Sequence, residues 1–160
     1  NGVGLTGVLD EAGRVISLTN VLGAFGFSYA GASSRLISKS LPNDQTETRG
    51  LGSIFEDLTL QRITHSVGAA PLSEFLYGRD VAAGRIATWS QQAGAQPLSM
   101  HSFAYDAANQ LLSVAVTNSG TRVASFEYSY DPAGNRLTER VGPSTHSASY
   151  NALNQISTST

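Results

Sequence analysis

The sequence contains no cysteine and little charge. Without a thiol, a disulfide framework, a thiolate nucleophile and a cysteine zinc site are all excluded. Charged residues make up only 14% of the chain, and the formal net charge is −2. No cluster of Lys and Arg occurs, so we expect neither nucleic acid nor an anionic lipid surface as a partner.

Long apolar runs and helical periodicity are also missing. No run approaches the roughly 18 residues of a membrane span, and no basic segment with an apolar stretch behind it follows Asn1. We therefore expect no membrane insertion, and a soluble piece of a longer, processed chain. Only short stretches such as residues 58–63 fit the helical spacing of 3.6. The 16 glycines indicate a turn-rich β protein instead.

One segment shows the alternation of a half-buried strand most clearly. From residue 123 to Tyr130, aromatic and small apolar side chains alternate with mostly polar ones. The alternation stops at residues 131–135, DPAGN, where Asp can bond its own backbone and Gly and Asn tolerate positive φ. Alternation resumes over residues 136–141, so the pattern predicts a strand, a tight reversal and a second strand.

The same pattern recurs along the chain, which indicates internal repeats. The strings are LDEAGRVI from Leu9, YAGASSRLI from Tyr29, RDVAAGRI from Arg79, YDAANQLL from Tyr105, YDPAGNRL from Tyr130 and YNALNQI from Tyr150, with a weaker copy, FEDLTLQRI, from Phe55. Most neighbouring copies lie 20 to 26 residues apart, enough for two strands and two turns. One such unit cannot bury its aromatic face alone, so consecutive units are expected to continue one sheet.

These strings resemble the YD repeats of the RHS family, which are shared with insecticidal toxin complexes and animal teneurins. The resemblance runs from Leu9 to about Ile156 and is clearest over residues 103–156. It implies an all-β fold in which tandem β-hairpin repeats form a continuous, curved antiparallel sheet, as a fragment of a hollow shell. Residues 1–160 would be a single segment of about six to seven repeats from a longer chain.

The resemblance also implies the roles of individual residues. The motif tyrosines would pack between turns of the sheet, and the Asp or Asn after each would fix the turn. The positions expected to be structural are Tyr29, Asp80, Gly84, Tyr105, Asp106, Asn109, Tyr130, Asp131, Gly134, Tyr150 and Asn151.

The function implied by the resemblance is a structural scaffold of a secreted or cell-surface protein, not an enzyme. Its partners would be flanking repeats or other copies joined through sheet edges, an enclosed C-terminal toxin, or surface glycans. The copies are too few to close a shell, and no DPxGR-type segment follows Ile156. Neither an intact shell nor self-cleavage is therefore expected.

Patterns that could indicate chemistry have simpler explanations. GxGxxG at residues 2–7 lacks the strand and helix of a nucleotide site, which favours a flexible lead-in. His65, His101 and His146 lack the close spacing of metal ligands. No GxSxG elbow accompanies the many serines, and the adjacent carboxylates at 10–11 and 56–57 would point to opposite sides of a strand. We expect no catalytic residue, cofactor or metal.

The aromatic side chains leave one alternative open, because buried aromatics fill a core whereas exposed ones stack on sugars. Their place just before each turn favours packing within the sheet. Trp89 lies in a polar stretch outside the motif and is the candidate for a ligand or interface contact. The alternative function is therefore a carbohydrate-binding or adhesion module that uses exposed aromatics.

Overall fold

A computed structural model of the 160-residue chain describes residues 4–53 and 57–160. These residues form fourteen β-strands and no helix. The strands are β1 (Thr6–Leu9), β2 (Val15–Asn20), β3 (Gly23–Tyr29), β4 (Leu36–Ser40), β5 (Gln45–Leu51), β6 (Leu60–Val67), β7 (Ala70–Arg79), β8 (Ile86–Ala93), β9 (Ser99–Tyr105), β10 (Leu111–Asn118), β11 (Thr121–Tyr130), β12 (Arg136–Val141), β13 (Ser144–Tyr150) and β14 (Ile156–Ser159).

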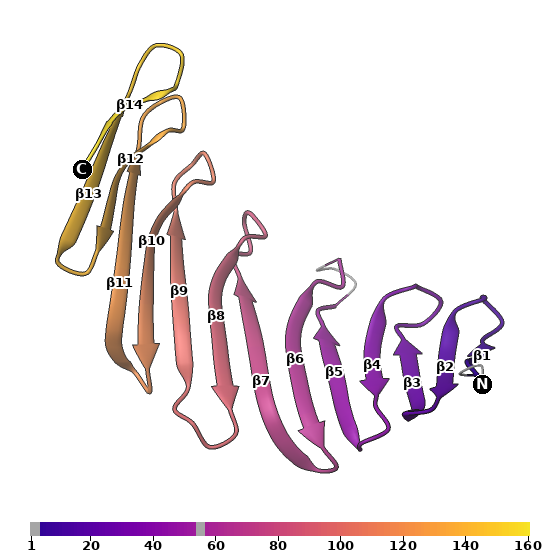
Figure 1. Ribbon diagram of the computed structural model, residues 1–160. Helices are drawn as coiled ribbons and strands as arrows, with labels where there is room; N and C mark the ends of the chain where they lie inside the picture. The colour runs from indigo at the N-terminus through magenta and orange to yellow at the C-terminus, as the bar shows by residue number, and fades with distance from the viewer. Residues whose placement is uncertain (1–3, 54–56) are drawn as a thin grey trace. The chain divides into compact units, whose positions relative to one another are not determined.

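The strands pair in chain order from β1 to β14 in one open antiparallel sheet, which confirms the all-β prediction (Figure 1). Neighbours in the sheet are also neighbours in the sequence, so the pairing is local throughout. Local antiparallel pairing needs no long crossover connection, and a sequence rich in turn residues can specify it directly. In the described part of the chain, nothing helical is available to span a bilayer.

The chain divides into two compact units. The N-terminal unit comprises residues 1–77 and 91–96, and the C-terminal unit comprises residues 78–90 and 97–160. Within each unit, the turns predicted from the repeated strings lie at one end of the strands, and the intervening turns lie at the other end (Figure 1). We call the first set the motif turns.

A β-bulge follows the motif turns. The register between β11 and β12 shifts between Ser129 and Tyr130, so that Tyr130 pairs with Arg136 whereas Ser129 pairs with Thr138. The same shift occurs beside the motif turns of β1–β2, β3–β4, β5–β6, β9–β10 and β13–β14. A bulge leaves one residue of the return strand unpaired and disrupts the ladder locally.

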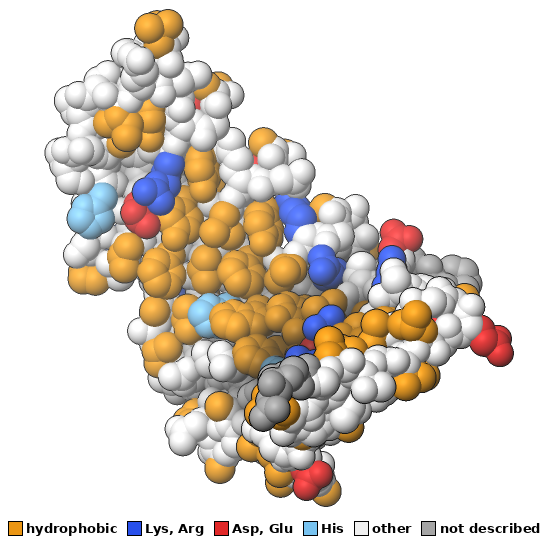
Figure 2. Space-filling model, turned by 45° about the vertical axis from the view of Figure 1, so that its right-hand side comes forward, with side chains coloured by type: hydrophobic (Ala, Val, Ile, Leu, Met, Phe, Trp, Pro, Cys, Tyr) orange, Lys and Arg blue, Asp and Glu red, His pale blue; other side chains and the backbone are white. Residues whose placement is uncertain are grey.

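Because side chains alternate along a strand, residues that pair across strands share a face. In the C-terminal unit, one face carries Phe103, Val114 and Phe126, which follow one another across β9, β10 and β11. The opposite face carries small side chains in the same strands, such as Ser102, Ala115 and Ser125, also in one row. Figure 2 shows one face on which hydrophobic side chains lie next to one another, with a few charged side chains among them.

The sheet has almost no interior. Among the described residues, Val114 at 9% exposure is the only buried hydrophobic side chain and Ser90 the only buried polar one. No described side chain is completely buried. A single sheet layer covers neither of its own faces, so the apolar side chains remain half-exposed.

Residues 58–63, the stretch that fits the helical spacing, contribute to a strand, because Leu60–Val67 forms β6. The glycine-rich lead-in is not irregular throughout, since Thr6 and Gly7 belong to β1. Phe55, the start of the weak copy, lies outside the described residues. The third motif turn nevertheless begins earlier than that copy, because β5 ends at Leu51, which pairs with Leu60.

Candidate functional site

The motif turns that carry Asp or Asn after the first strand share a hydrogen-bond pattern centred on that residue, whereas the second copy has Ala30 there. One Oδ1 atom of Asp131 accepts the backbone N–H groups of Ala133 and Asn135, each at 2.9 Å. Asp106 accepts two N–H groups in the same way, each at 2.8 Å. The amide oxygen of Asn151 accepts two N–H groups at 2.9 and 3.1 Å. A short carboxylate or amide that bonds its own backbone closes a reversal without help from distant residues.

The first and fourth copies add an ion pair to this pattern. Asp10 is 2.7 Å from the guanidinium of Arg14, and Asp80 is 2.7 Å from that of Arg85. The backbone N–H of Arg14, and then its side chain, holds the pKa of Asp10 below its usual range despite some desolvation. For Asp80, the side-chain hydrogen bond from Arg85 is the main cause of the lowered pKa.

Asp131 has no arginine in its turn, yet the pKa of this carboxyl is also lowered. The side-chain amide of Asn135 donates to its Oδ2 at 2.8 Å, and this bond is the main cause. Neutral donors therefore replace the guanidinium in this copy. The turns thus share a side-chain oxygen that accepts backbone N–H groups, and neither the cation nor, at Asn151, the carboxylate is required.

One position in each of these turns has positive φ. It is occupied by Gly13, Asn109, Gly134 and Asn154 in turn, with φ of 76°, 65°, 88° and 57°. Glycine and asparagine tolerate this region best, which explains why the strings end in AG, AN or LN before the return strand. Gly84, in the longer fourth turn, has φ of 67°.

The motif tyrosines connect each hairpin to the one before it. The hydroxyl of Tyr130 donates to the carbonyl oxygen of Leu111 at 3.0 Å, and that of Tyr105 donates to the carbonyl of Ile86 at 2.9 Å. Tyr29 and Tyr150 make the same bond to Val15 and Arg136, at 2.8 and 3.1 Å. Every acceptor is the first residue of a return strand. The tyrosines therefore lie between hairpins, and their hydroxyls join them.

Arginines at the end of the motif make the complementary connection forward. Arg85 donates to the carbonyl of Asp106, at 3.1 Å, and to Asn109, and its guanidinium lies 5.0 Å from the centre of the Tyr105 ring. Arg14 donates to the carbonyls of Gly31 and Ser33 and lies over the ring of Tyr29. The recurrence of Arg at the end of AGR in both strings was the sequence signal for this connection, which the motif alone did not suggest.

The structure therefore places Tyr29, Tyr105, Tyr130 and Tyr150 in one kind of contact. Asp80, Asp106, Asp131 and Asn151 lie in the turns, at the oxygen that closes each reversal. Gly84, Asn109 and Gly134 occupy positive-φ positions. Asp106, Tyr130 and Asp131 line one depression between neighbouring motif turns, but the whole set does not meet in one pocket. Each kind of residue recurs from hairpin to hairpin, at the end of the strands where the motif turns lie.

The N-terminal unit carries a charged row across its central strands. The paired residues Phe27, Lys39, Glu47, His65 and Ser73 follow one another from β3 to β7. Glu47 is 13% exposed and lies 2.6 Å from Arg49, 3.4 Å from Lys39 and 3.8 Å from His65.

The carboxyl of Glu47 is stabilised in its charged form. Burial raises its pKa, but the hydrogen bond and charge of Arg49, with help from Lys39, outweigh burial and lower the pKa overall. His65 also contacts the hydroxyl of Ser73 through Nδ1 at 3.0 Å, and its ring meets that of Phe75 edge-on. Ser73 and His65 lie on the surface of a sheet, and the Glu47 oxygens are already shared among cations, so the arrangement is that of an ion-pair cluster.

Trp89 lies on the aromatic face of the C-terminal unit. Its ring is 4.5 Å from that of His101, centre to centre, and His101 is 6.4 Å from Phe103. Trp89 is only partly exposed. The candidate ligand residue therefore belongs to an aromatic row, beside the apolar side chains of β9 to β11.

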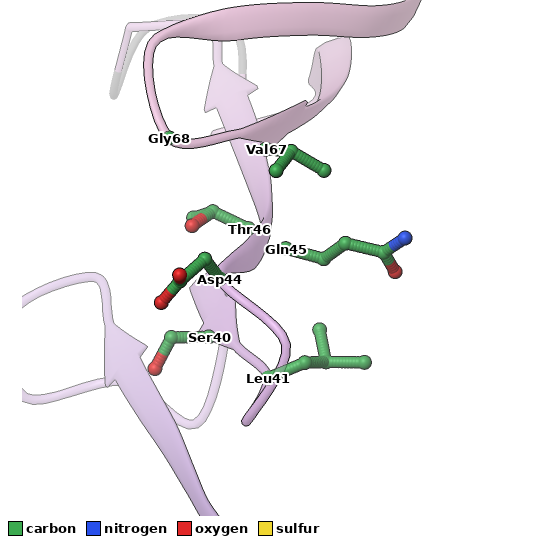
Figure 3. A pocket seen from close by; sticks show the side chains of 7 residues that line it. All are labelled: Ser40, Leu41, Asp44, Gln45, Thr46, Val67 and Gly68. Carbon is green, nitrogen blue, oxygen red and sulfur yellow. The ribbon is translucent and has the colours of Figure 1, made fainter.

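One depression of the N-terminal unit shows how its functional groups are arranged. In a depression of the N-terminal unit, Ser40, Asp44 and Thr46 point to one side, whereas Leu41, Gln45 and Val67 point away from them (Figure 3). The functional groups lining the depression thus do not converge. Across residues 4–53 and 57–160, no group of three His, Asp or Glu side chains could hold a metal ion.

Comparison with known proteins agrees with this architecture. Residues 105–147 match the RHS repeat family. No curated protein sequence matches the chain. Among solved structures, the chain resembles the pore of the Photorhabdus luminescens Tc holotoxin, with a TM-score of 0.62 and 15% identity. It also resembles two crystal structures of TcdB2-TccC3, with TM-scores of 0.62 and 0.60 and identities of 14% and 15%.

Each of these alignments covers 92% of the chain but only 10% of the solved one. The chain thus spans about a tenth of the length of the structures it resembles. The fold is a sheet of consecutive antiparallel β-hairpins that repeat one motif. Residues 105–147 thus carry an RHS repeat, and the chain as a whole shares the fold of these solved structures.

Proposed function

We propose that residues 1–160 form one YD-repeat segment of a secreted or cell-surface RHS-like protein and act as scaffold, not as an enzyme. The observation that carries the proposal is the repeated hairpin whose tyrosines and arginines bond the neighbouring hairpins. Such a sheet can be extended at either end by further hairpins of the same kind. Its role would be to contribute wall to a larger shell or extracellular assembly.

The exposed surface supports this proposal. The chain exposes 10420 Å². A compact monomer of its mass would expose about 7,700 Å², and two separate compact bodies of half that mass would together expose about 9,200 Å². The exposed area of the chain is larger than both values, so the excess area remains even if the two units are counted as separate bodies. It has the size of a protein interface, which indicates that further polypeptide covers part of the sheet.

The partners we propose are further repeats, either from the same longer chain or from other copies. The solved structures with this fold are parts of toxin complexes, so an enclosed toxic segment is a further proposed partner. The exposure of Leu5, Val8 and Leu9 at strand β1 is what favours contact with further repeats there.

Light scattering of the purified chain over a range of concentrations tests the assembly. We expect species that grow with concentration, because unpaired edges are available. Val8→Lys should reduce the growth, since a lysine on an edge strand opposes pairing. Val81→Lys adds the same charge at a fully exposed turn residue and should leave growth unchanged. A single small species at every concentration would contradict edge assembly.

A second candidate function is carbohydrate binding, favoured by the aromatic row of Trp89, His101 and Phe103. Partly exposed aromatic rings provide flat surfaces on which sugar rings can stack. A glycan array with the native chain and with Trp89→Ala tests it. Binding that the substitution abolishes would support the candidate. Absence of binding to every glycan, or binding that Trp89→Ala leaves unchanged, would rule it out.

A further inference from the structure

Two arginines at the ends of motif turns occupy the same kind of site. The guanidinium of Arg85 lies 2.7 Å from a carboxylate oxygen of Asp80, in its own turn. It donates at 3.1 Å to the carbonyl of Asp106, in the next turn, and lies 5.0 Å from the centre of the Tyr105 ring. One guanidinium thus contacts a carboxylate, a carbonyl and an aromatic ring, and it joins two successive turns.

Arg14 reproduces these three contacts in the N-terminal unit. Its guanidinium lies 2.7 Å from Asp10, donates to the carbonyl of Gly31 at 2.8 Å and lies 4.8 Å from the centre of the Tyr29 ring. A guanidinium has five N–H donors, so it bonds a carboxylate and a carbonyl at once while its flat face meets the ring. The site is therefore built by two successive motif turns and recurs in the chain.

The turn that begins at Asp106 has no arginine at this position. Gln110 stands directly before the return strand of its hairpin, as Arg14 and Arg85 do, so the glutamine takes the place of the arginine. Oδ1 of Asp106 accepts the N–H groups of Ala108 and Gln110. In the described part of the chain, no group donates to its Oδ2, the oxygen that pairs with the arginine in the first and fourth copies.

The next turn presents the carbonyl and the ring. The carbonyl of Asp131 accepts the N–H of Gly134 within its turn. The corresponding carbonyl of Asp106 accepts such an N–H and also the guanidinium of Arg85, because a carbonyl oxygen has two lone pairs. The Asp131 carbonyl thus has the same capacity for a second donor. Tyr130 holds the place of the ring, and no guanidinium lies over it among the described residues.

These groups meet in one depression of the C-terminal unit. Asp106, Tyr130 and Asp131 line an open depression of about 470 Å³ between the two turns, together with Gln110. The depression therefore combines a carboxylate with an unpaired oxygen, a carbonyl and an aromatic ring. This is the set of groups that holds Arg14 and Arg85 in the other copies.

We propose that this depression binds the guanidinium of an arginine side chain from another polypeptide. The Asp106 carboxylate and the Asp131 carbonyl accept its N–H groups, and the Tyr130 ring receives its flat face. A lysine ammonium is a point charge without a plane, so arginine is preferred. The proposal goes beyond the scaffold function, because it assigns the sheet a contact with a partner chain that presents an arginine.

The test uses the intact 160-residue protein and the N-methylamide of N-acetyl-arginine as the probe. Titration by saturation-transfer nuclear magnetic resonance needs only dilute protein, which keeps self-assembly out of the measurement. The citrulline analogue has nearly the same shape without the charge and should bind at least about fivefold more weakly. The lysine analogue keeps the charge without the plane and should also bind more weakly than arginine.

Variants of the protein locate the site. Gln110→Arg places a guanidinium in the depression from within and should abolish binding of the probe. Asp106→Asn keeps the oxygen that closes the turn, as Asn151 does in the last copy, and should weaken binding at least about fivefold. Asp44→Asn makes the same change of charge in the N-terminal unit and should bind the probe like the native protein.

The outcomes are decided on the native protein first. Absence of binding, or equal binding of the arginine and citrulline probes, would overturn the proposal even if a variant failed to fold. Binding that Gln110→Arg and Asp106→Asn leave unchanged would overturn it as well, since the arginine would then be held elsewhere. None of these results bears on the scaffold function, which light scattering tests separately.

Discussion

The two units of the chain share their turns but differ in the rows of side chains across their strands. In the N-terminal unit the row is Phe27, Lys39, Glu47, His65 and Ser73. In the C-terminal unit the equivalent row is Phe103, Val114, Phe126 and Val141. A charged cluster in one unit thus corresponds to an apolar strip in the other, on the same kind of hairpin.

This difference shows that the motif determines the backbone and leaves the faces free. The turn residues bond to their own hairpin or the next one, so they need nothing from the rest of the row. The residues in mid-strand are held only by their cross-strand neighbours. Repeats can therefore acquire different surfaces at positions outside the motif, while the motif residues keep the same hairpin backbone.

The largest effect is expected in the apolar strip. Val114→Asp places a charge at the most buried hydrophobic position and should lower the free energy of unfolding by about 3 kcal/mol or more. Val67→Asp, in the N-terminal unit, is a matched change at a half-exposed valine and should cost less than about 1 kcal/mol. Urea unfolding followed by circular dichroism measures both. Equal costs would contradict the difference in burial between these two valines.

The next effect concerns a turn. Gly134 has φ of 88°, so Gly134→Val should destabilise the protein by about 1–2 kcal/mol. Gly134→Asn is the control, because asparagine holds the equivalent positive-φ position at Asn109 and Asn154, and it should cost only a few tenths of a kcal/mol. The urea midpoints of the two variants decide the point. A neutral Gly134→Val would mean that the turn adopts another register.

Loss of one tyrosine hydroxyl should have a smaller effect, and a similar one in both units. Tyr130→Phe and Tyr29→Phe each remove a bond to a neighbouring hairpin and should cost about 1 kcal/mol. Tyr128→Phe removes no such bond and should be close to neutral. Thermal unfolding of the three variants gives the comparison. A neutral Tyr130→Phe with a costly Tyr128→Phe would reverse the assigned roles.

The smallest effect is expected at the charged row, and it should depend on pH. The folded-state pKa of Glu47 lies below its usual value of 4.5. Its contribution to stability is therefore complete above about pH 4.5 and is lost as the pH falls through the lowered pKa. The difference in urea midpoint between the native protein and Glu47→Gln should accordingly shrink from pH 7 to pH 3.

A second variant checks the cause of that pH dependence. Arg49→Gln removes the cation that contributes most to the lowered pKa of Glu47, so its acid dependence should resemble that of Glu47→Gln. A stability difference that stays constant from pH 7 to pH 3 would show that the Glu47 cluster does not titrate as described.

Much of the fold followed from the sequence because its signals are local. Alternation predicted the strand that ends at Tyr130, and DPAGN predicted the reversal after it; both are present. The family resemblance is confirmed by the RHS repeat at residues 105–147 and the shared fold. The weaker copy that begins at Phe55 falls on residues outside those that the structure describes.

The contacts between hairpins could not be predicted in the same way. The sequence indicated that the tyrosines pack within the sheet, but not that their hydroxyls reach a carbonyl 14 or 19 residues earlier. That contact depends on the bulge, which shifts the register by one residue. Nor did the sequence show that His65 lies beside Glu47, because their pairing depends on the register of β5 and β6.

By itself, then, the sequence determined the strand and turn order, because Asp, Asn and Gly close each reversal through bonds within five residues. Only the tertiary structure decided which side chains share a row and which carbonyls receive the tyrosines. Those relations depend on the register between strands, and a shift of one residue would move every side chain to the other face.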